Sequence, residues 1–476
     1  MEDQVRRYSL FFTLAVVFFT AVSSASVAEE FPSLTFEKGG KTYRIEAGEE
    51  RVIVRGIRPE EQLWGPYQFP RPYDLGDRFV VGVHITDDNI ATYGAKNRWF
   101  ESRDQGLTWQ EVDESIRPEC GVPLANGDKL FFPTENAVDV SDYLIRSFER
   151  RLPNYDYTKK AEPGTFPIPD GVTCWMGGTT IYAYNADRLP APFDKKVWRA
   201  KLLRAGEKEA VDVEVPVDWP YLTRVVHMYG SQRVLKSIFP RGNLKRGADG
   251  ALWISAFSGE GHIDPSNGQY SPYYSAELFR SADEGKSFQR VAHMEYPADG
   301  QYYPYASGGF SDSDFEFMPD GSIVWFFRSN WYGSTGEEWS PMYFTRSTDM
   351  GKTWAKPTRF APVGTLPRLC NLKGGFTLVC YARPGMFVQV CTDDSGIEWS
   401  EPLELMTPGD RSHLANKVEE SPRFHDWDGA CNNPELLPLD DNSALFFYSD
   451  FYYPDEEGVK RKTILCRTLT ITEVEK

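Results

Sequence analysis

Three acidic side chains of this 476-residue chain stand where acid and base chemistry can be done. Asp87 and Asp88 follow the apolar segment VGVHIT, and Glu435 lies in the segment CNNPELLPLDDNSALFFY. A pair of carboxyl groups, one protonated and one ionised, can act together as an acid and a base or nucleophile. Glu435 is two positions after Asn433 and therefore lies on the same face of an extended strand. We interpret these groups as candidate catalytic carboxyls; the alternatives are two loop aspartates and a solvated or bridging glutamate.

An aromatic loop, DGQYYPYASGG, brings together Tyr302, Tyr303 and Tyr305. Tyrosine rings offer a flat surface on which a sugar ring can stack, and we take Tyr303 as a candidate substrate-binding residue. The same loop can equally pack on its neighbours, so both interpretations stay open.

A repeated octamer indicates the elements that must hold these residues. Each copy reads hydroxyl, any residue, Asp, any residue, Gly, any residue, then Ser, Thr or Glu, and an aromatic residue. Asp can bond the backbone two residues on, Gly adopts a positive φ without strain, and the aromatic residue begins the next strand, so each copy predicts a hairpin turn. The copies are SRDQGLTW (102–109), SADEGKSF (281–288), STDMGKTW (347–354) and TDDSGIEW (392–399).

Four copies mark a repeat of roughly 40 to 50 residues, the size of a four-stranded propeller blade. Short apolar or alternating runs recur along the chain, while long helical periodicity is nearly absent. We therefore predict an all-β fold, a six-bladed β-propeller of four-stranded antiparallel blades. The segment 41–56 is expected to join the C-terminal strands and close the ring. The segments DKLFFPT, GTTIYAYN and VWRAKLLRAG are assigned to the second blade.

The octamer resembles the Asp box, or BNR repeat, of the sialidase (neuraminidase) superfamily. In that family the box lies on the blade rim, away from the active centre. The resemblance therefore implies a sialidase-like scaffold and a structural role for the four box aspartates. These are Asp104, Asp283, Asp349 and Asp394.

The same resemblance implies a clamp of three arginines, from the first, fourth and fifth blades, that holds the carboxylate of a sialic acid. Arginine suits this role because its planar fork donates two charge-assisted hydrogen bonds and stays charged. Arg71, Arg328 and Arg383 look like the three clamp residues. The family pattern of Arg, apolar, Pro is shortened at the first of them to Arg71 and Pro72. The alternative for each arginine is a surface or inter-blade ion pair.

The resemblance fails at the nucleophile. Counted from the following turn, Asn433 stands where the family has a tyrosine, and Asp312 stands where it has a glutamate. Asparagine cannot attack an anomeric carbon as a phenolate does, so Asn433 is assigned to substrate binding and the chemistry to carboxyl groups. The candidate catalytic residues are then Asp312, Glu435, Asp88 and Asp87.

The first 28 residues have the pattern of a secretory signal. Two arginines precede an apolar run from Leu10 to Val22, and small residues lead to a cleavage site after Ala28. The apolar core of about 13 residues is short for a membrane span, which needs about 20, although an uncleaved anchor is the alternative. We expect an exported protein, periplasmic or extracellular, with one propeller domain over 29–476 and no membrane insertion after cleavage.

The net charge of −17 argues against nucleic acid as a partner. Seven cysteines without CxxC spacing do not predict a disulfide framework. Cys380, Cys391 and Cys466 lie in apolar strand-like runs and are expected to be buried. The six histidines are scattered, so no metal or cofactor is predicted, while calcium stays open.

We therefore predict an exported sialidase-like glycoside hydrolase that removes a terminal acidic sugar from a glycan or glycoconjugate. The main alternative is a non-catalytic carbohydrate-binding propeller that kept the arginine clamp. A third is a hydrolase for another acidic sugar, such as a uronic acid, because an arginine clamp recognises carboxylates in general.

Overall fold

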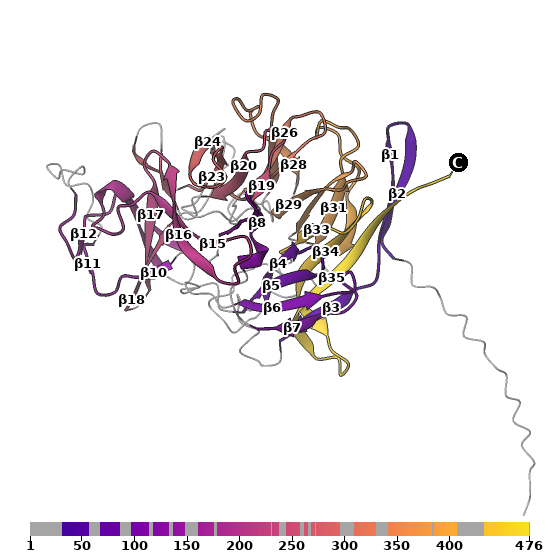
Figure 1. The fold of residues 1–476 in the computed structure, drawn as a ribbon, viewed down its shortest axis with the longest axis horizontal. Helices are drawn as coiled ribbons and strands as arrows, with labels where there is room; N and C mark the ends of the chain where they lie inside the picture. Colours follow the sequence, from indigo (N-terminus) through magenta and orange to yellow (C-terminus); the bar gives the residue numbers. More distant parts are fainter. Residues whose placement is uncertain are drawn as a thin grey trace, which may run out of the picture. The chain divides into compact units, whose positions relative to one another are not determined.

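The computed structural model describes most of the chain from residue 31 onward (Figure 1). Residues Pro32–Lys476 form one compact unit, and the regular structure of its described residues is β-strand apart from short 3₁₀ helices such as η2 (Pro118–Cys120) and η4 (Ala186–Arg188). In the described part of the chain, no helix is long and apolar enough to cross a membrane. The predicted leader, 1–28, lies outside the described residues. These are 31–56, 67–85, 97–113, 118–132, 137–147, 160–175, 179–229, 231–237, 244–257, 261–264, 268–271, 273–295, 309–329, 341–362, 364–382, 385–406 and 433–475.

Three sheets are antiparallel meanders of four strands that follow the order of the chain. The first contains β4 (Gln68–Asp74), β5 (Phe79–His84), β6 (Asn97–Ser102) and β7 (Gln110–Val112). The second contains β25 (Phe310–Phe317), β26 (Ile323–Ser329), β27 (Met342–Ser347) and β28 (Thr358–Ala361). The third contains β29 (Thr365–Asn371), β30 (Thr377–Ala382), β31 (Met386–Val390) and β32 (Leu403–Met406).

An eight-stranded sheet consists of two further groups of four, joined by a short parallel contact between β16 and β24. One group is β8 (Val122–Pro123), β9 (Lys129–Phe131), β15 (Val197–Leu203) and β16 (Ala210–Asp218). The other is β19 (Lys245–Arg246), β20 (Leu252–Phe257), β23 (Ser275–Ser281) and β24 (Phe288–Glu295).

A six-stranded sheet joins the two ends of the described chain. It contains β33 (Glu435–Pro438), β34 (Ser443–Pro454), β35 (Lys460–Glu473), β1 (Ser33–Lys38), β2 (Lys41–Ala47) and β3 (Arg51–Arg55). Both β2 and β3 pair with β35, which confirms the expectation that segment 41–56 joins the C-terminal strands.

A five-stranded sheet is inserted between these groups. Its strands are β10 (Ala137–Asp139), β18 (Gln232–Ser237), β17 (Thr223–Tyr229), β14 (Thr179–Asn185) and β13 (Gly171–Trp175). Short pairs are formed by β11 (Leu144–Ile145) with β12 (Thr165–Phe166) and by β21 (His262–Ile263) with β22 (Tyr270–Ser271). The assignment of GTTIYAYN to the second blade is wrong, because β14 pairs with β17 and the place next to β15 is taken by β16. A strand whose apolar and polar residues alternate can pair in either sheet, so the sequence pattern of GTTIYAYN does not show which sheet it joins.

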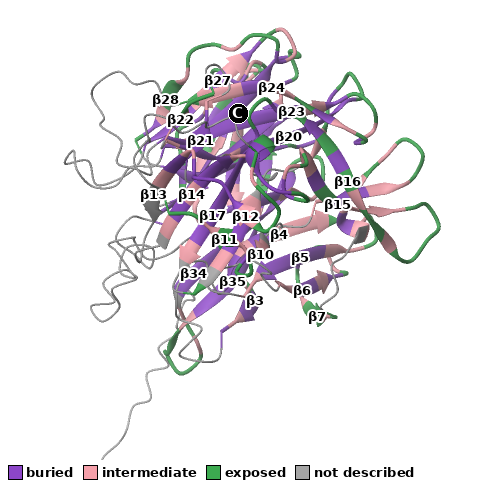
Figure 2. Ribbon diagram, turned by 90° about the vertical axis from the view of Figure 1, so that its left-hand side faces the viewer, coloured by how far each residue is buried: buried purple, intermediate pink, exposed green. Residues whose placement is uncertain are grey.

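Apolar clusters between neighbouring sheets form the core. Trp253 of β20 shares one cluster with Trp325 of β26, and Phe447 of β34 shares another with Val81 of β5, so the last sheet packs on the first. Figure 2 shows buried residues along the strands and exposed residues in the connecting loops. Because β25 contacts β29, β29 contacts β33 and β33 contacts β4, the arrangement is propeller-like. The predicted buried cysteines Cys380, Cys391 and Cys466 are free thiols in these clusters.

Three of the four octamers form the predicted turns with the same hydrogen bonds. In the octamer 347–354, Asp349 accepts from the Thr353 amide at 2.8 Å and from its hydroxyl at 2.6 Å, while the Ser347 hydroxyl accepts from Gly351 N–H at 2.8 Å. The octamers 102–109 and 281–288 repeat this set. The Thr353 hydrogen bonds hold the pKa of Asp349 at about 2.

The fourth octamer departs from the pattern. The prediction that Asp394 holds this turn is wrong: Asp393 accepts from Gly396 N–H at 3.0 Å and from Glu398 N–H at 3.4 Å. Asp394 is exposed and pairs with Lys38 at 3.1 Å. Two adjacent aspartates compete for the same amides, and the sequence does not show which of them lies closer.

We predict that Asp349→Asn lowers the melting temperature at neutral pH, because the amide replaces an anionic acceptor. The folded-state pKa of Asp349 is depressed, so its contribution is fully present above about pH 4 and is lost as the pH falls towards 2. The gap in melting temperature between wild type and variant should therefore narrow between pH 7 and pH 3. Asp394→Asn is the control and should change little at any pH, because it removes only a surface pair. A gap that stays constant with pH would contradict this assignment.

Candidate functional site

Four inner strands present a charged side chain at the same position, which we call the charged ring. At the end of each of these strands, a backbone N–H donates across the turn that follows. The donors are Leu75, Met318, Leu372 and Leu439, and each charged residue lies four positions before its donor. Equal spacing from the turn places these side chains at one level of neighbouring strands. The ring consists of Arg71 on β4, Asp314 on β25, Arg368 on β29 and Glu435 on β33.

A buried ion pair joins two members of the charged ring. Arg368 Nε donates to Glu435 Oε1 at 2.6 Å, and Arg368 Nη1 donates to the carbonyl of Pro367 at 3.0 Å. Burial raises the pKa of Glu435, and the nearby charges of Arg368 and Arg71 oppose this rise without cancelling it. Burial alone would lower the pKa of Arg368, but Glu435, Asp314 and Asp312 raise it. Glu435 is therefore a carboxyl that takes up a proton more readily than one in water.

A second network ties three sheets together beside this pair. Asp314 accepts from the Leu369 N–H at 2.8 Å, and Lys245 Nζ lies 2.9 Å from Glu316 Oε2 and 3.4 Å from Asp314. Burial alone would lower the pKa of Lys245, but Asp314 and Glu316 raise it, so the ammonium stays charged. These contacts link β19, β25 and β29 around the axis.

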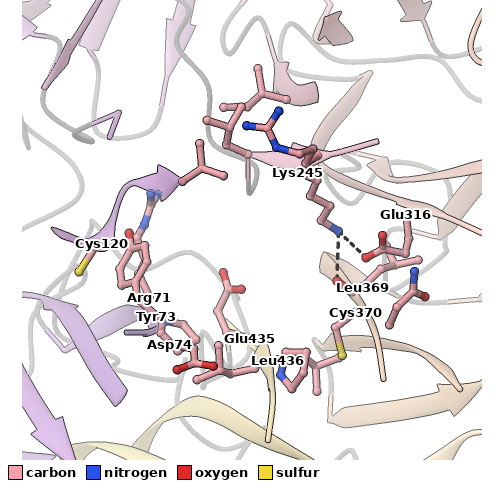
Figure 3. A pocket seen from close by; sticks show the side chains of 18 of the residues that line it. Arg71, Tyr73, Asp74, Cys120, Lys245, Glu316, Leu369, Cys370, Glu435 and Leu436 are labelled. Atoms are coloured by element: carbon pink, nitrogen blue, oxygen red, sulfur yellow. Dashed lines mark hydrogen bonds and ion pairs between the residues drawn. The ribbon is translucent and has the colours of Figure 1, made fainter. Parts of the chain in front are cut away.

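The inner strands enclose a cavity of about 470 Å³, the axial cavity (Figure 3). Its wall includes residues from each of the groups of strands around it. Glu435 points its carboxyl group into the open centre, with Arg71 and Tyr73 on one side and Lys245 and Glu316 on the other. Burial raises the pKa of Tyr73, against the effect of Arg71. The axial cavity thus has charged groups of both signs within an apolar wall, as ligand-binding cavities do.

Asp312 on β25 and Asn433 just before β33 precede the charged ring, at what we call the strand-start end, and Arg328 lies beside Asp312 on the neighbouring strand β26. Arg328 Nη1 donates to Asp312 Oδ2 at 2.9 Å, and Asn433 Nδ2 donates to Gln68 Oε1 at 2.9 Å. None of these four residues lines the axial cavity. The structure therefore joins Asp312 to Arg328 but does not bring Arg328 to the cavity that Arg71 lines.

The backbone is strained at the strand-start end of three inner strands. Phe69, Asp312 and Leu366 have φ of 49°, 28° and 51°, and each lies at a shift in the pairing register. Each stands two residues before a member of the charged ring. Such conformations cost about 1–3 kcal/mol apiece and cluster at functional sites.

Unsatisfied polar atoms gather at the same level. Among the described residues, Ser311 Oγ, Ser313 Oγ, Gln68 Nε2 and Asn433 Oδ1 are buried and have no hydrogen-bond partner. Leaving such an atom unpaired costs roughly 1–3 kcal/mol. Backbone strain and unpaired polar atoms therefore occur together at the strand-start end.

The remaining predicted site residues, Asp87, Asp88, Tyr303 and Arg383, lie outside the described residues. Sequence reasoning missed Arg368, Asp314, Lys245 and Glu316. A signal for one of them was present: the tripeptides 69–71, 366–368 and 433–435 each place a proline directly before a charged residue, giving FPR, LPR and NPE. When the three tripeptides are aligned on their prolines, Arg368 occupies the same position as Arg71 and Glu435.

No protein-family model matches the chain, and no curated protein sequence matches it. A protein of unknown function from Dyadobacter fermentans has a similar backbone, with 15% identity, a TM-score of 0.48, and coverage of 90% of this chain and 99% of that one. A Hadza microbial sialidase is 11% identical with a TM-score of 0.45, over 91% of this chain and 73% of the sialidase. The α-L-arabinanase of Penicillium chrysogenum is 12% identical with a TM-score of 0.43, over 88% of this chain and 98% of the arabinanase. At these identities the likeness concerns the course of the backbone and assigns no substrate.

We predict that Arg368→Met destabilises the protein by about 3–5 kcal/mol, because it leaves the Glu435 carboxyl buried without its partner. The double variant Arg368→Met with Glu435→Leu should recover most of this loss, since apolar side chains of similar volume often replace a buried pair at little cost. Denaturant unfolding of the wild type, both single variants and the double variant gives the coupling energy. Equal destabilisation of the Arg368 and double variants would refute the pairing.

Proposed function

We propose that the protein is an exported glycoside hydrolase that removes a terminal acidic sugar, a sialic acid or a related one, from glycans. The observation that carries the proposal is the Glu435 carboxyl, which points into the open centre of the axial cavity (Figure 3), pairs with Arg368 and has its pKa raised by burial. A carboxyl whose pKa is raised by burial is suited to give its proton to a leaving oxygen. The signal pattern of residues 1–28 supports export.

The proposal includes a six-bladed propeller as the scaffold. Support comes from the three four-stranded sheets, the two halves of the eight-stranded sheet, and the sheet of β33, β34 and β35 completed by β2 and β3. On this scaffold the octamer turns correspond to Asp boxes.

The second carboxyl group of the reaction is assigned to Asp312. The ion pair with Arg328 favours the ionised form of Asp312, as a nucleophile or base requires. Asp312 and Glu435 both act electrostatically on Arg368, which ties the two carboxyl groups to one guanidinium. An acid and an ionised carboxylate on two inner strands are the pair that glycoside cleavage needs.

The substrate carboxylate is assigned to Arg71, Arg328 and Arg383; Arg71 would approach it from the axial cavity and Arg328 from the strand-start end, outside that cavity. A guanidinium carries five N–H donors, and the contact with Asp312 uses only some of them. Arg328 can therefore also donate a bidentate pair of hydrogen bonds to a substrate carboxylate. The unpaired polar atoms of Ser311, Gln68 and Asn433 would contact the sugar hydroxyls.

We predict that Glu435→Gln abolishes release of the terminal sugar while glycan binding stays within a few-fold of wild type, because glutamine keeps the acceptor for Arg368 but has no proton to give. The assay measures free acidic sugar released from a panel of sialylated and uronic-acid glycans. Glu316→Gln is the matched control, since it also changes a buried carboxyl paired with a cation in the axial cavity, and it should keep most of the activity. Loss of activity in both variants would assign Glu435 a structural role.

We also predict that Arg328→Lys weakens binding of the acidic glycan more than about tenfold, because a bidentate charge-assisted pair contributes roughly 1.5–3 kcal/mol. Binding of a neutral glycan should not change. Arg346→Lys is the control, because Arg346 lies in the same sheet but pairs with Asp320 at the turn. Equal weakening of acidic and neutral ligands would remove Arg328 from carboxylate recognition.

A non-catalytic carbohydrate-binding propeller is the second candidate. It is favoured by Asn433 at the position of the family's tyrosine and by the engagement of Glu435 with Arg368. Glycan binding that persists without any turnover of the panel would support this candidate over the hydrolase.

A further inference from the structure

Two histidines and a glutamate from separate segments converge on one point away from the axial cavity. His262 lies on β21, whereas His293 and Glu295 end β24. Glu295 Oε1 lies 2.7 Å from His262 Nε2 and 3.1 Å from His293 Nε2. One ligand atom of each residue lies within 4.8 Å of the other two. His262 and Glu295 are 33 positions apart, so no metal-binding spacing marks them in the sequence.

The opposite nitrogen of each ring is also engaged. His262 Nδ1 lies 2.7 Å from the carbonyl oxygen of Tyr273, and His293 Nδ1 lies 2.6 Å from Glu277 Oε1. Since a carbonyl oxygen only accepts, Nδ1 of His262 must carry a proton. In the neutral ring the lone pair of Nε2 then faces the carboxylate of Glu295. Glu277 is buried and also accepts from the Ser275 hydroxyl at 2.9 Å, so it holds His293 in the same way.

Lone pairs that face a carboxylate at these distances require a positive charge between them, supplied either by protons or by a metal ion. A histidine that binds a metal almost always donates its other N–H to a carbonyl or a carboxylate. Both of those partners are present here.

We propose that His262, His293 and Glu295 bind one divalent transition-metal ion of the zinc class. The two Nε2 atoms and the carboxylate supply three ligands, and nitrogen ligands favour zinc over calcium or magnesium. His262 is 1% exposed, whereas the Glu295 side chain is 42% exposed, so the ion enters from the solvent side through Glu295 and a fourth position stays open to water.

The site joins β21 to the end of β24, two strands that belong to different sheets. β21 lies in the segment between β20 and β23, and Ile263 N–H donates to Thr223 Oγ1 at 2.7 Å on β17 of the five-stranded sheet. A metal bound by His262, His293 and Glu295 fixes this segment to the end of β24. The proposal does not depend on the proposed hydrolase activity.

The test uses the chain without its leader and without a polyhistidine tag, treated with a chelator and then desalted. Titration with zinc, followed by elemental analysis after gel filtration, should give one ion per chain and a higher melting temperature. Cobalt(II) is a second probe, because binding through two nitrogens with four or five ligands changes its visible absorption. Glu295→Gln should weaken zinc binding by more than about 100-fold, beyond the roughly 10- to 100-fold typical of a change outside the ligand set.

Glu46→Gln is the matched control, since Glu46 is similarly exposed and pairs with Arg44 at 2.9 Å on β2. It should bind zinc as the wild type does. No retained zinc, no rise in melting temperature and the spectrum of aqueous cobalt would overturn the proposal and leave a cluster of protonated histidines. Unchanged zinc binding in Glu295→Gln would equally overturn it, because the metal would then be elsewhere.

Discussion

The packing of each sheet on the next, with the last sheet on the first, is the constraint on which the other features depend. Buried aromatic residues such as Trp253, Trp325 and Phe447 fill the spaces between sheets, and the pairing of β2 and β3 with β35 joins the two ends of the described chain. Once the sheets are held face to face, their first strands must run side by side around one axis. Side chains that alternate along these strands therefore meet at the axis whatever their separation in the sequence.

Charges that meet in a buried space must be compensated, and the charged ring does this with arginines and carboxylates from neighbouring strands. Arg368 forms an ion pair with Glu435, and the charges of Asp314 and Asp312 also raise the pKa of Arg368. Such a ring is weak evidence for stability, because buried pairs recover little more than the cost of removing them from water. Its value lies in the environment it makes: a carboxyl whose pKa is raised by burial stands among fixed positive charges.

The two ends of the inner strands differ in character. At the other end, nearer the turns that follow these strands, charged side chains of the axial cavity form ion pairs, such as that of Lys245 with Glu316. At the strand-start end, positive φ values, register shifts and unpaired polar atoms occur together. Positive φ values and unpaired buried polar atoms both cost free energy, and their coincidence at this end supports the binding role that we propose for it.

The sequence by itself determined the local parts of this protein. The octamers specify their turns because Asp, Gly and a hydroxyl residue act within a few positions of one another, and the aromatic strands specify an all-β fold that buries them. It also offered Arg71, Asp312, Arg328 and Glu435 as candidate site residues, from the family resemblance and from their spacing to a following turn or to Asn433. The tertiary structure alone decided which of these meet: Glu435 pairs with Arg368, Arg328 with Asp312, and His262 with Glu295. It also decided that β14 leaves its neighbours for another sheet and that Asp393 takes the place of Asp394. These outcomes depend on contacts between residues far apart in the chain, or on competition between equivalent hydrogen-bond acceptors. A local sequence pattern does not contain the free energies of these interactions.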